Sequence, residues 1–383
     1  MPHRYFSGGG MRVRALRRTA QPMTSALARF DVTVRRLGTV LEPDDEPNEA
    51  EGVLNPACAR APGGELLLYP RTVAAGNVSR VGLLRDAGAG DDVRFQRLGY
   101  ALEPSEPYEM RAPGTGGMGC EDPRVTYVPV LERYVMAYTA FGPLGPRVAL
   151  ALSSDAYHWE RLGLVDFTAH GLPSGDDKDG VFFPEPVHSP AGVLSLAFYH
   201  RPMKKLSTLD GHAAIPSLLE LPPTERESTC IAYVPLDSVR ADIRNLLVPF
   251  ESTLVLAPDG PWGRLKTGAG TPPVRIAEGW FALYHAVDAV EIDGRYAMTY
   301  SAGVVIHDID RPHILVYRSQ VPVLTPEHPD EMHGVVNNVV FPTGIDVRGE
   351  RQFDVYYGMA DARIGRASVT LPPAAVIGKT AAA

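Results

Sequence analysis

Apolar and polar residues alternate over short stretches along most of this 383-residue chain, which is the pattern of half-buried β-strands. Each stretch is followed by turn-forming residues. The 37 glycines and 35 prolines favour many tight turns over long helices. The pattern therefore predicts an all-β protein built from many short strands.

Five segments of the chain share one order of features: a proline, a polar turn and then an apolar strand rich in aromatic residues. The prolines are Pro56, Pro123, Pro184, Pro273 and Pro342, which are separated by 67, 61, 89 and 69 residues. The strands are expected at 66–69, 134–138, 194–199, 280–284 and 353–357. A further hairpin strand follows most of them, as at 147–153 and 295–304.

Four strands per repeat are typical of a propeller blade, so five repeats predict a five-bladed β-propeller with a central active-site funnel. The longest step is explained by an insertion near residues 204–227. Two β-sandwiches would also give evenly spaced short strands. The propeller is favoured because it would bring the polar residues beside the prolines together.

Composition excludes some classes of function. A net charge of -8 argues against a nucleic-acid-binding surface. Three widely spaced cysteines suggest neither a disulfide framework nor a zinc motif, and no metal is expected. No apolar run approaches the roughly 20 residues of a membrane-spanning helix.

The first 28 residues are basic and lack both a strand pattern and the apolar core of a secretory signal. We expect a poorly ordered tail at 1–28, a single catalytic domain at 29–383 and a cytoplasmic location. The basic N-terminus and the apolar C-terminus at 376–383 are both candidates for contacts in a homo-oligomer.

Charged and amide residues recur at matching places in the five repeats. They are Asn55, Glu121 with Asp122, Lys178 with Asp179, Lys266, and Asn337 with Asn338 near the prolines, and Arg71, His200 with Arg201, His285 and Asp361 near the ends of the strands. One such residue alone is more often a surface or capping residue. Recurrence in every repeat favours one shared site, with an acid among cations in a funnel floored by tyrosines.

Asp122 is the strongest candidate acid. It follows a glycine-rich loop at 114–119 and stands with Glu121 and Arg124 at the start of a strand, where a carboxylate can meet a ligand. An Asp that caps a turn before proline is the alternative interpretation.

Several motifs together resemble glycoside hydrolase family 130, the β-mannoside phosphorylases and their hydrolytic relatives, which are five-bladed propellers. The motifs lie at 119–124 (GCEDPR), 178–185 (KDGVFFPE), 200–202 (HRP), 268–273 (GAGTPP) with 279–280 and 284–285, and 356–361 (YYGMAD). The resemblance extends from about Asn55 to Leu371.

The resemblance implies a role for each matched residue. Asp122 is the proton donor, acting through a hydroxyl of the mannose, and inorganic phosphate is a co-substrate that attacks the opposite face with inversion. The phosphate contacts are Lys178, Arg201 and Lys266, with Tyr300 as a helper. The mannose subsite holds Asn55, Arg71, His285 and Asp361, and we also expect Glu121, Arg124 and Asn338 at the substrate. No other cofactor is implied.

The physical logic of phosphorolysis agrees with this set. An inverting hydrolase uses two carboxylates about 6.5–9.5 Å apart with water between them, whereas phosphate is already an anionic nucleophile. Fixed cations are needed to orient it. Three such cations would repel one another without an anion, so we expect them to serve phosphate rather than stability.

Three other functions remain open from the sequence. A hydrolase of the same family would need a glutamate base, for which Glu220, Glu225 and Glu227 of the insertion are candidates. A non-catalytic propeller would bind a glycan without cleaving it. A hydrolase of another five-bladed family, acting on arabinans or fructans, would use carboxylates such as Asp122, Asp179 and Asp361. The linkage and the acceptor sugar are not predicted.

Overall fold

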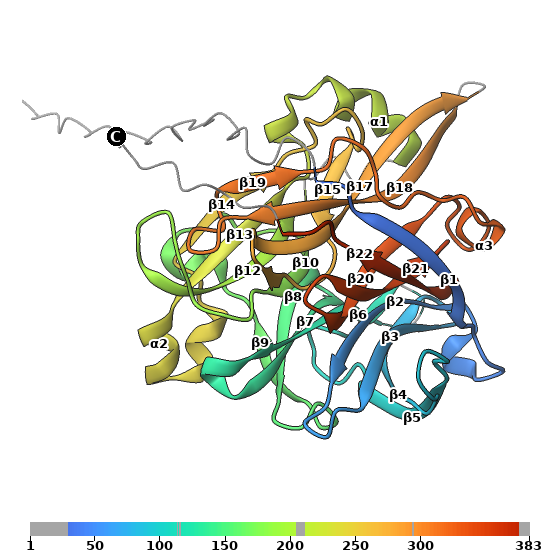
Figure 1. Cartoon of the computed structure of the whole chain (residues 1–383), viewed down its shortest axis with the longest axis horizontal. Helices are drawn as coiled ribbons and strands as arrows, with labels where there is room; N and C mark the ends of the chain where they lie inside the picture. The colour runs from blue at the N-terminus through green and yellow to red at the C-terminus, as the bar shows by residue number, and fades with distance from the viewer. Residues whose placement is uncertain (1–29, 113, 115, 204–210, 293–294, 375–383) are drawn as a thin grey trace, which may run out of the picture.

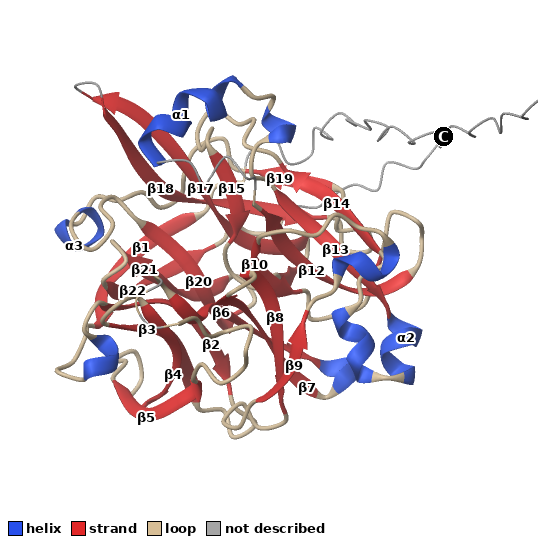
Figure 2. Cartoon of the chain, turned by 180° about the vertical axis from the view of Figure 1, so that it is seen from behind, coloured by secondary structure: helices blue, strands red, loops and turns tan. Residues whose placement is uncertain are grey.

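The computed structural model describes residues 30–112, 114, 116–203, 211–292 and 295–374 (Figure 1). Strands dominate these residues, and the short helices lie at the periphery (Figure 2). The predicted all-β class is confirmed. The predicted tail at 1–28 lies outside the described residues.

The strands form five antiparallel meanders of four main strands each. The first is β2 (Gly52–Arg60), β3 (Leu66–Ala74), β4 (Val78–Asp86) and β5 (Phe95–Leu102), and the second is β6 (Met118–Val128), β7 (Arg133–Gly142), β8 (Gly145–Ser153) and β9 (Glu160–Leu164). The third is β10 (Asp177–Phe182), β12 (Leu194–Pro202), β13 (Thr229–Pro235) and β14 (Glu251–Leu256). The fourth is β15 (Lys266–Ala269), β17 (Gly279–Ile292), β18 (Arg295–His307) and β19 (Leu315–Arg318).

The fifth meander joins the two ends of the described chain. It consists of β20 (Val340–Gly349), β21 (Gln352–Met359), β22 (Arg363–Thr370) and β1 (Thr33–Leu41). Strand β1 pairs antiparallel with β22, and both lie side by side in Figure 1. Arg36 of β1 also donates to the buried Glu331 at 2.8 Å. The N-terminal strand therefore completes the last sheet.

Short pairings complete the sheets. Strands β11 (Val187–His188) and β16 (Val274–Ile276) pair with β12 and β17. A two-residue parallel pairing between β4 and β6 joins the first two meanders into one eight-stranded sheet.

The five predicted aromatic strands are confirmed as the second strands of the meanders, β3, β7, β12, β17 and β21. Their tyrosines are buried between the sheets, however. Tyr69 bonds the carbonyl of Ala156, and Tyr138 bonds Glu109. The prediction of a funnel floored by these tyrosines is wrong, because the alternation along each strand turns their rings into the core.

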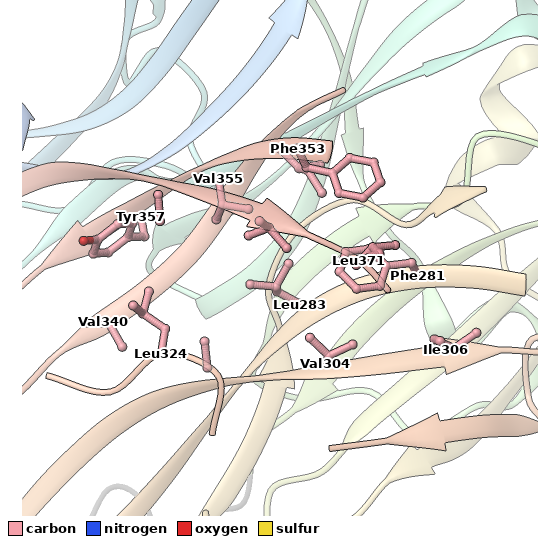
Figure 3. Packing of buried hydrophobic residues seen from close by; sticks show 14 of the residues in the cluster. Phe281, Leu283, Val304, Ile306, Leu324, Val340, Phe353, Val355, Tyr357 and Leu371 are labelled. Atoms are coloured by element: carbon pink, nitrogen blue, oxygen red, sulfur yellow. The ribbon is translucent and has the colours of Figure 1, made fainter. Parts of the chain in front are cut away.

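Each meander packs on the next through an apolar cluster, and the fifth packs on the first. Figure 3 shows the cluster between the fourth and fifth meanders, where Phe281 stacks on Phe353 with ring centroids 5.4 Å apart. Burial of each such ring contributes about 1.5–3 kcal/mol. No sheet closes on itself within the described residues, so the five-bladed arrangement stays a prediction at this point.

The predicted insertion lies between β12 and β13. Its described part begins with α1 (Gly211–Glu220), which packs through Ile215 against Val287 and Ala289 of β17. The hairpin of β17 and β18 extends beyond the other strands beside α1 (Figures 1 and 2). The remaining helices are α2 (Leu236–Ala241), α3 (Pro329–Met332) and short 3₁₀ turns at Pro47–Glu49, Pro129–Leu131, Phe167–His170, Pro223–Glu225 and Ile243–Leu247.

Candidate functional site

The first strands of three successive meanders share one irregularity. In β2, β6 and β10, two residues lie opposite a single residue of the next strand, which is a β-bulge. Asn55, Asp122 and Asp179 stand at this bulge with φ of 43°, 46° and 61°. A left-handed backbone costs roughly 1–2 kcal/mol for most side chains, and Asn and Asp tolerate it best. Since a bulge redirects a side chain, the same bulge in each first strand places the three polar groups at equivalent positions.

Asp122 lies at the centre of the first of two charged clusters. Its Oδ1 accepts hydrogen bonds from Asn55 Nδ2 at 2.9 Å and from Arg71 Nη1 at 3.3 Å. Glu121 accepts from Arg71 Nη2 at 3.0 Å and from Lys178 Nζ at 2.9 Å. The fold thus brings together five predicted site residues from three meanders.

The environment separates the pKa values of two carboxyl groups in this cluster. Burial favours the neutral form of Asp122, but Arg71 and Lys178 outweigh it and hold its pKa below the ordinary value. Burial raises the pKa of Asp361 to about 6, against the opposing charge of Arg71 and with the support of Asp122. Two neighbouring carboxyls with divergent pKa values are typical of catalytic sites.

The second charged cluster is built around Asp179. Its Oδ2 accepts from Arg201 Nε at 2.6 Å and its Oδ1 from Arg124 Nη2 at 3.4 Å. Arg201 also donates through Nη1 to Glu227. Lys178 and Arg201 are therefore both matched by internal carboxylates. The expectation that the cations would repel one another without a bound anion is wrong for these two, because Glu121, Asp179 and Glu227 offset their charges.

Arg124 connects the two clusters. It is only 1% exposed, and it donates to the backbone carbonyls of Asp122, Ala269 and Gly270 at 3.0, 3.2 and 3.3 Å. Its side chain thereby ties β6 to the end of β15 as well as to Asp179. The predicted contact between Arg124 and substrate stays a prediction.

His285 is held neutral at the edge of the second cluster. Burial lowers its pKa to about 3, and its Nδ1 donates to the carbonyl of Ala269 at 2.9 Å. Its Nε2 then carries a lone pair and can accept a hydrogen bond; it lies 3.7 Å from Asp179 Oδ2. Gly268 permits this approach, since a Cβ there would lie 2.2 Å from the His285 ring and 2.3 Å from Asp179 Oδ2.

The remaining predicted residues come from the fourth and fifth meanders. The ammonium of Lys266 lies 5.1 Å from the centroid of the Tyr300 ring. The backbone N–H of Tyr300 donates to the carbonyl of Asn338 at 2.9 Å. Asp361 stands between β21 and β22 with φ of 51°. The positive charge of Lys266 opposes the rise in the pKa of its carboxyl group. These residues therefore border the two clusters.

Some of the polar residues that recur in the sequence lie elsewhere. His200 pairs with Asp177 at 2.7 Å and stacks on Phe167, which precedes the third meander. Glu220 and Glu225 of the insertion are exposed to solvent.

Within the described part of the chain, no group of three or more His, Cys, Asp and Glu residues is placed to hold a metal ion. The same residues include no helix long and apolar enough to cross a membrane.

Two residues of the candidate site, Asp179 and Glu227, received no role in the phosphorylase predicted from the sequence. Asp179 is among the recurring residues, and the structure places it at the same repeat position as Asn55 and Asp122. Glu227 could be named only as one of three glutamates in an insertion. Which of the three lies at the site depends on how the inserted segment folds back onto Arg201.

Comparison with known proteins identifies relatives of this chain. The model of glycoside hydrolase family 130, described as beta-1,4-mannooligosaccharide phosphorylase, matches residues 244–373. The 1,2-beta-oligomannan phosphorylase of Thermoanaerobacter sp. is 28% identical over 292 residues, which cover 75% of this chain and 77% of that one. The chain is a relative of glycoside hydrolase family 130.

Two further relatives of family 130 extend the comparison. The beta-1,4-mannooligosaccharide phosphorylase of Ruminococcus albus is 33% identical over 118 residues, or 30% of this chain and 34% of that one. The structure of beta-1,2-mannobiose phosphorylase from Listeria innocua superposes with a TM-score of 0.64 at 20% identity, over 89% of this chain and 97% of that one. The last likeness shows a common fold.

The segment matched by the family-130 model covers the last part of the third meander, the whole fourth meander and most of the fifth. It includes Lys266, His285, Tyr300, Asn338 and Asp361. Asp122 and Arg201 lie outside it, so their places in the site come from the geometry described above.

Proposed function

We propose that this protein is an inverting glycoside phosphorylase that cleaves β-mannosides with inorganic phosphate, giving α-mannose 1-phosphate and a shortened sugar. The relatives described above are named as phosphorylases of mannosides. The observation that carries the proposal is one buried acid, Asp122, which accepts hydrogen bonds from the amide of Asn55 and the guanidinium of Arg71 and lies next to the Lys178–Glu121 pair.

In this reaction a phosphate oxygen forms a bond to the anomeric carbon while the bond from that carbon to the leaving oxygen breaks. The leaving oxygen takes a proton that originates on Asp122 and passes through a mannose hydroxyl. The phosphate is held by Lys178, Arg201, Lys266 and Tyr300. The sugar is held by Asn55, Arg71, Glu121, Arg124, His285, Asn338 and Asp361. Inorganic phosphate is the co-substrate, and no other cofactor is required.

Asp122 must be protonated to act as the acid, whereas Arg71 and Lys178 hold it ionised in the free protein. An incoming phosphate anion shares these cations and weakens their hold on the Asp122 carboxylate. The pKa of Asp122 therefore rises when phosphate binds. Proton donation then becomes coupled to the presence of the nucleophile.

We also infer that the five meanders are the blades of a five-bladed propeller. The apolar clusters run from each meander to the next and from the fifth back to the first, which supports a closed ring. First strands also contact one another, as β2 contacts both β6 and β20. The bulged residues of β2, β6 and β10 would then face the common axis.

A hydrolase of the same family is the second candidate. Glu227 favours it, because this buried carboxylate accepts a hydrogen bond from Arg201, a proposed phosphate contact, and could activate water instead. A hydrolase of another five-bladed family is less well supported, since Asp179 is engaged by two arginines. Homo-oligomer formation and a cytoplasmic location stay predictions.

The test is incubation with β-1,2- and β-1,4-linked manno-oligosaccharides, with and without inorganic phosphate. The proposal expects mannose 1-phosphate only when phosphate is present, and the substrate panel assigns the linkage. Free mannose at equal rates with and without phosphate would favour the hydrolase. Binding of the sugars with no product in either condition would instead favour a glycan-binding propeller.

A further inference from the structure

Glu227 is an unexpected second carboxylate on a cation assigned to phosphate. It is 6% exposed and accepts a hydrogen bond from Arg201 Nη1, while Arg201 Nε donates to Asp179. Asp179 orients Arg201 but also accepts from Arg124, so one carboxylate is shared by two guanidiniums. Glu227 supplies the second negative charge, and because burying a charge is costly unless it gains partners, its place beside Arg201 affects any anion that binds there.

The inserted segment holds Glu227 firmly in place. The neighbouring Arg226 donates to the backbone carbonyls of Leu219, Leu221 and Arg264. The carbonyl of Glu227 itself accepts from the N–H of Thr267 at 3.1 Å. Thr267 follows Lys266, a second residue assigned to phosphate. Glu227 is thus fixed between two of the cationic residues of the proposed anion site.

The charges of this cluster are already balanced before any ligand binds. Two guanidiniums, those of Arg124 and Arg201, face two carboxylates, those of Asp179 and Glu227. A fully ionised anion placed beside Arg201 would meet the Glu227 carboxylate as a repulsive neighbour. An oxyanion that carries a proton would instead donate a hydrogen bond to it, and charge-assisted hydrogen bonds are the strong ones.

We propose that Glu227 makes the anion site selective for protonated oxyanions such as phosphate and against sulfate, which carries no proton near neutral pH. This inference rests on the proposed phosphorylase function and adds a specificity-determining residue to it. One phosphate oxygen keeps its proton and donates to Glu227, while an unprotonated oxygen attacks the anomeric carbon. Asp122 takes its proton from solvent and gives it to the leaving oxygen, so no proton has to leave the phosphate during the exchange of bonds.

The alternative role for Glu227, a base that activates water, makes different predictions. A base is needed for turnover without phosphate, and its loss would abolish release of free mannose. A selectivity residue acts on the choice of anion, so its conversion to an amide changes which anions bind and does not selectively abolish release of free mannose. An amide can donate to a fully ionised oxygen, so Glu227→Gln removes the discrimination against sulfate while keeping the shape of the side chain.

The experiment measures the binding of inorganic phosphate and of sulfate by calorimetry to the wild-type protein and to Glu227→Gln, together with sulfate inhibition of phosphorolysis. Glu225→Gln is the matched control, since Glu225 lies on the same segment and is exposed. The wild type and the control should prefer phosphate by roughly 100-fold or more, and Glu227→Gln should lose at least about tenfold of this preference.

Equal binding of phosphate and sulfate by the wild type would overturn the inference, even if Glu227→Gln did not fold. An unchanged preference in a folded Glu227→Gln would overturn it as well, and both results would leave phosphorolysis intact. Absence of phosphate binding to the wild type would overturn the proposed function itself.

Discussion

Asn55 donates a hydrogen bond to Asp122 at 2.9 Å across 67 residues of sequence. Both residues have a left-handed backbone at the same bulge of successive meanders. The repeat thus places an amide and an acid side by side, and the hydrogen bond from the amide orients the acid. This pairing is the geometric core of the proposed site.

Replacing the acid tests its role in catalysis. Asp122→Asn keeps the size of the side chain but cannot donate an acidic proton, so turnover should fall by roughly 10²–10⁴-fold. Binding of the sugar should persist, as measured by calorimetry. Asp237→Asn is the control, because the side chain of Asp237 is 95% exposed. A variant at 122 with wild-type turnover would remove this residue from the mechanism.

Arg201, a proposed phosphate contact, also contributes to the stability of the fold. Arg201→Ala would leave Asp179 and Glu227 as buried carboxylates without their shared partner, which costs about 3–5 kcal/mol of unfolding free energy. Arg201→Lys keeps the charge but not the fork of donors, so it should fold and show a raised KM for phosphate. Denaturant unfolding and phosphate saturation curves separate the two effects.

The exposed Arg240 provides the comparison for these variants. Its side chain is 57% exposed and pairs with the surface residue Asp237. Arg240→Ala should therefore change neither the free energy of unfolding nor the KM for phosphate. If Arg201→Ala were as stable as the wild type, the paired carboxylates would not depend on this guanidinium.

Asp361 should make stability depend on pH. Its folded pKa of about 6 is above the ordinary 3.8, so the folded protein binds the extra proton and loses stability as pH rises from about 4 to about 6. Asp361→Asn removes this loss. The Tm difference, variant minus wild type, should be more positive near pH 7.5 than near pH 4. A difference independent of pH would contradict the raised pKa.

Gly268 should be intolerant of a side chain. Gly268→Ala places a Cβ against the His285 ring and Asp179, and overpacking of this kind costs about 1–3 kcal/mol. The loss of activity should exceed what the loss of stability explains, because both neighbours belong to the proposed site. Gly175→Ala is the matched control, since no atom lies within 4 Å of its added Cβ. Thermal unfolding and initial rates measure the two effects.

The strand pattern and the repeat were predictable from the sequence because both are local. Alternation marks β3 and β7 directly, and the spacing of Asn55 and Asp122 already equals one repeat. The resemblance of motifs such as that at 119–124 then named the family, and the comparisons agree with it.

The ion pairs were not predictable, because they depend on contacts between distant segments. Arg201 meets Glu227 only through the fold of an inserted segment that has no counterpart in the repeat. The tyrosines were misplaced for a related reason. Their periodicity shows that they alternate but not which face of each sheet is covered by the next meander.

The central claim is that phosphate, rather than water, attacks the anomeric carbon. The most direct measurement is the reaction of a β-manno-oligosaccharide with inorganic phosphate in ¹⁸O-labelled water, followed by mass spectrometry and NMR of the products. The account predicts α-mannose 1-phosphate without ¹⁸O from the solvent. Free mannose labelled with ¹⁸O at the anomeric oxygen as the first product would contradict it.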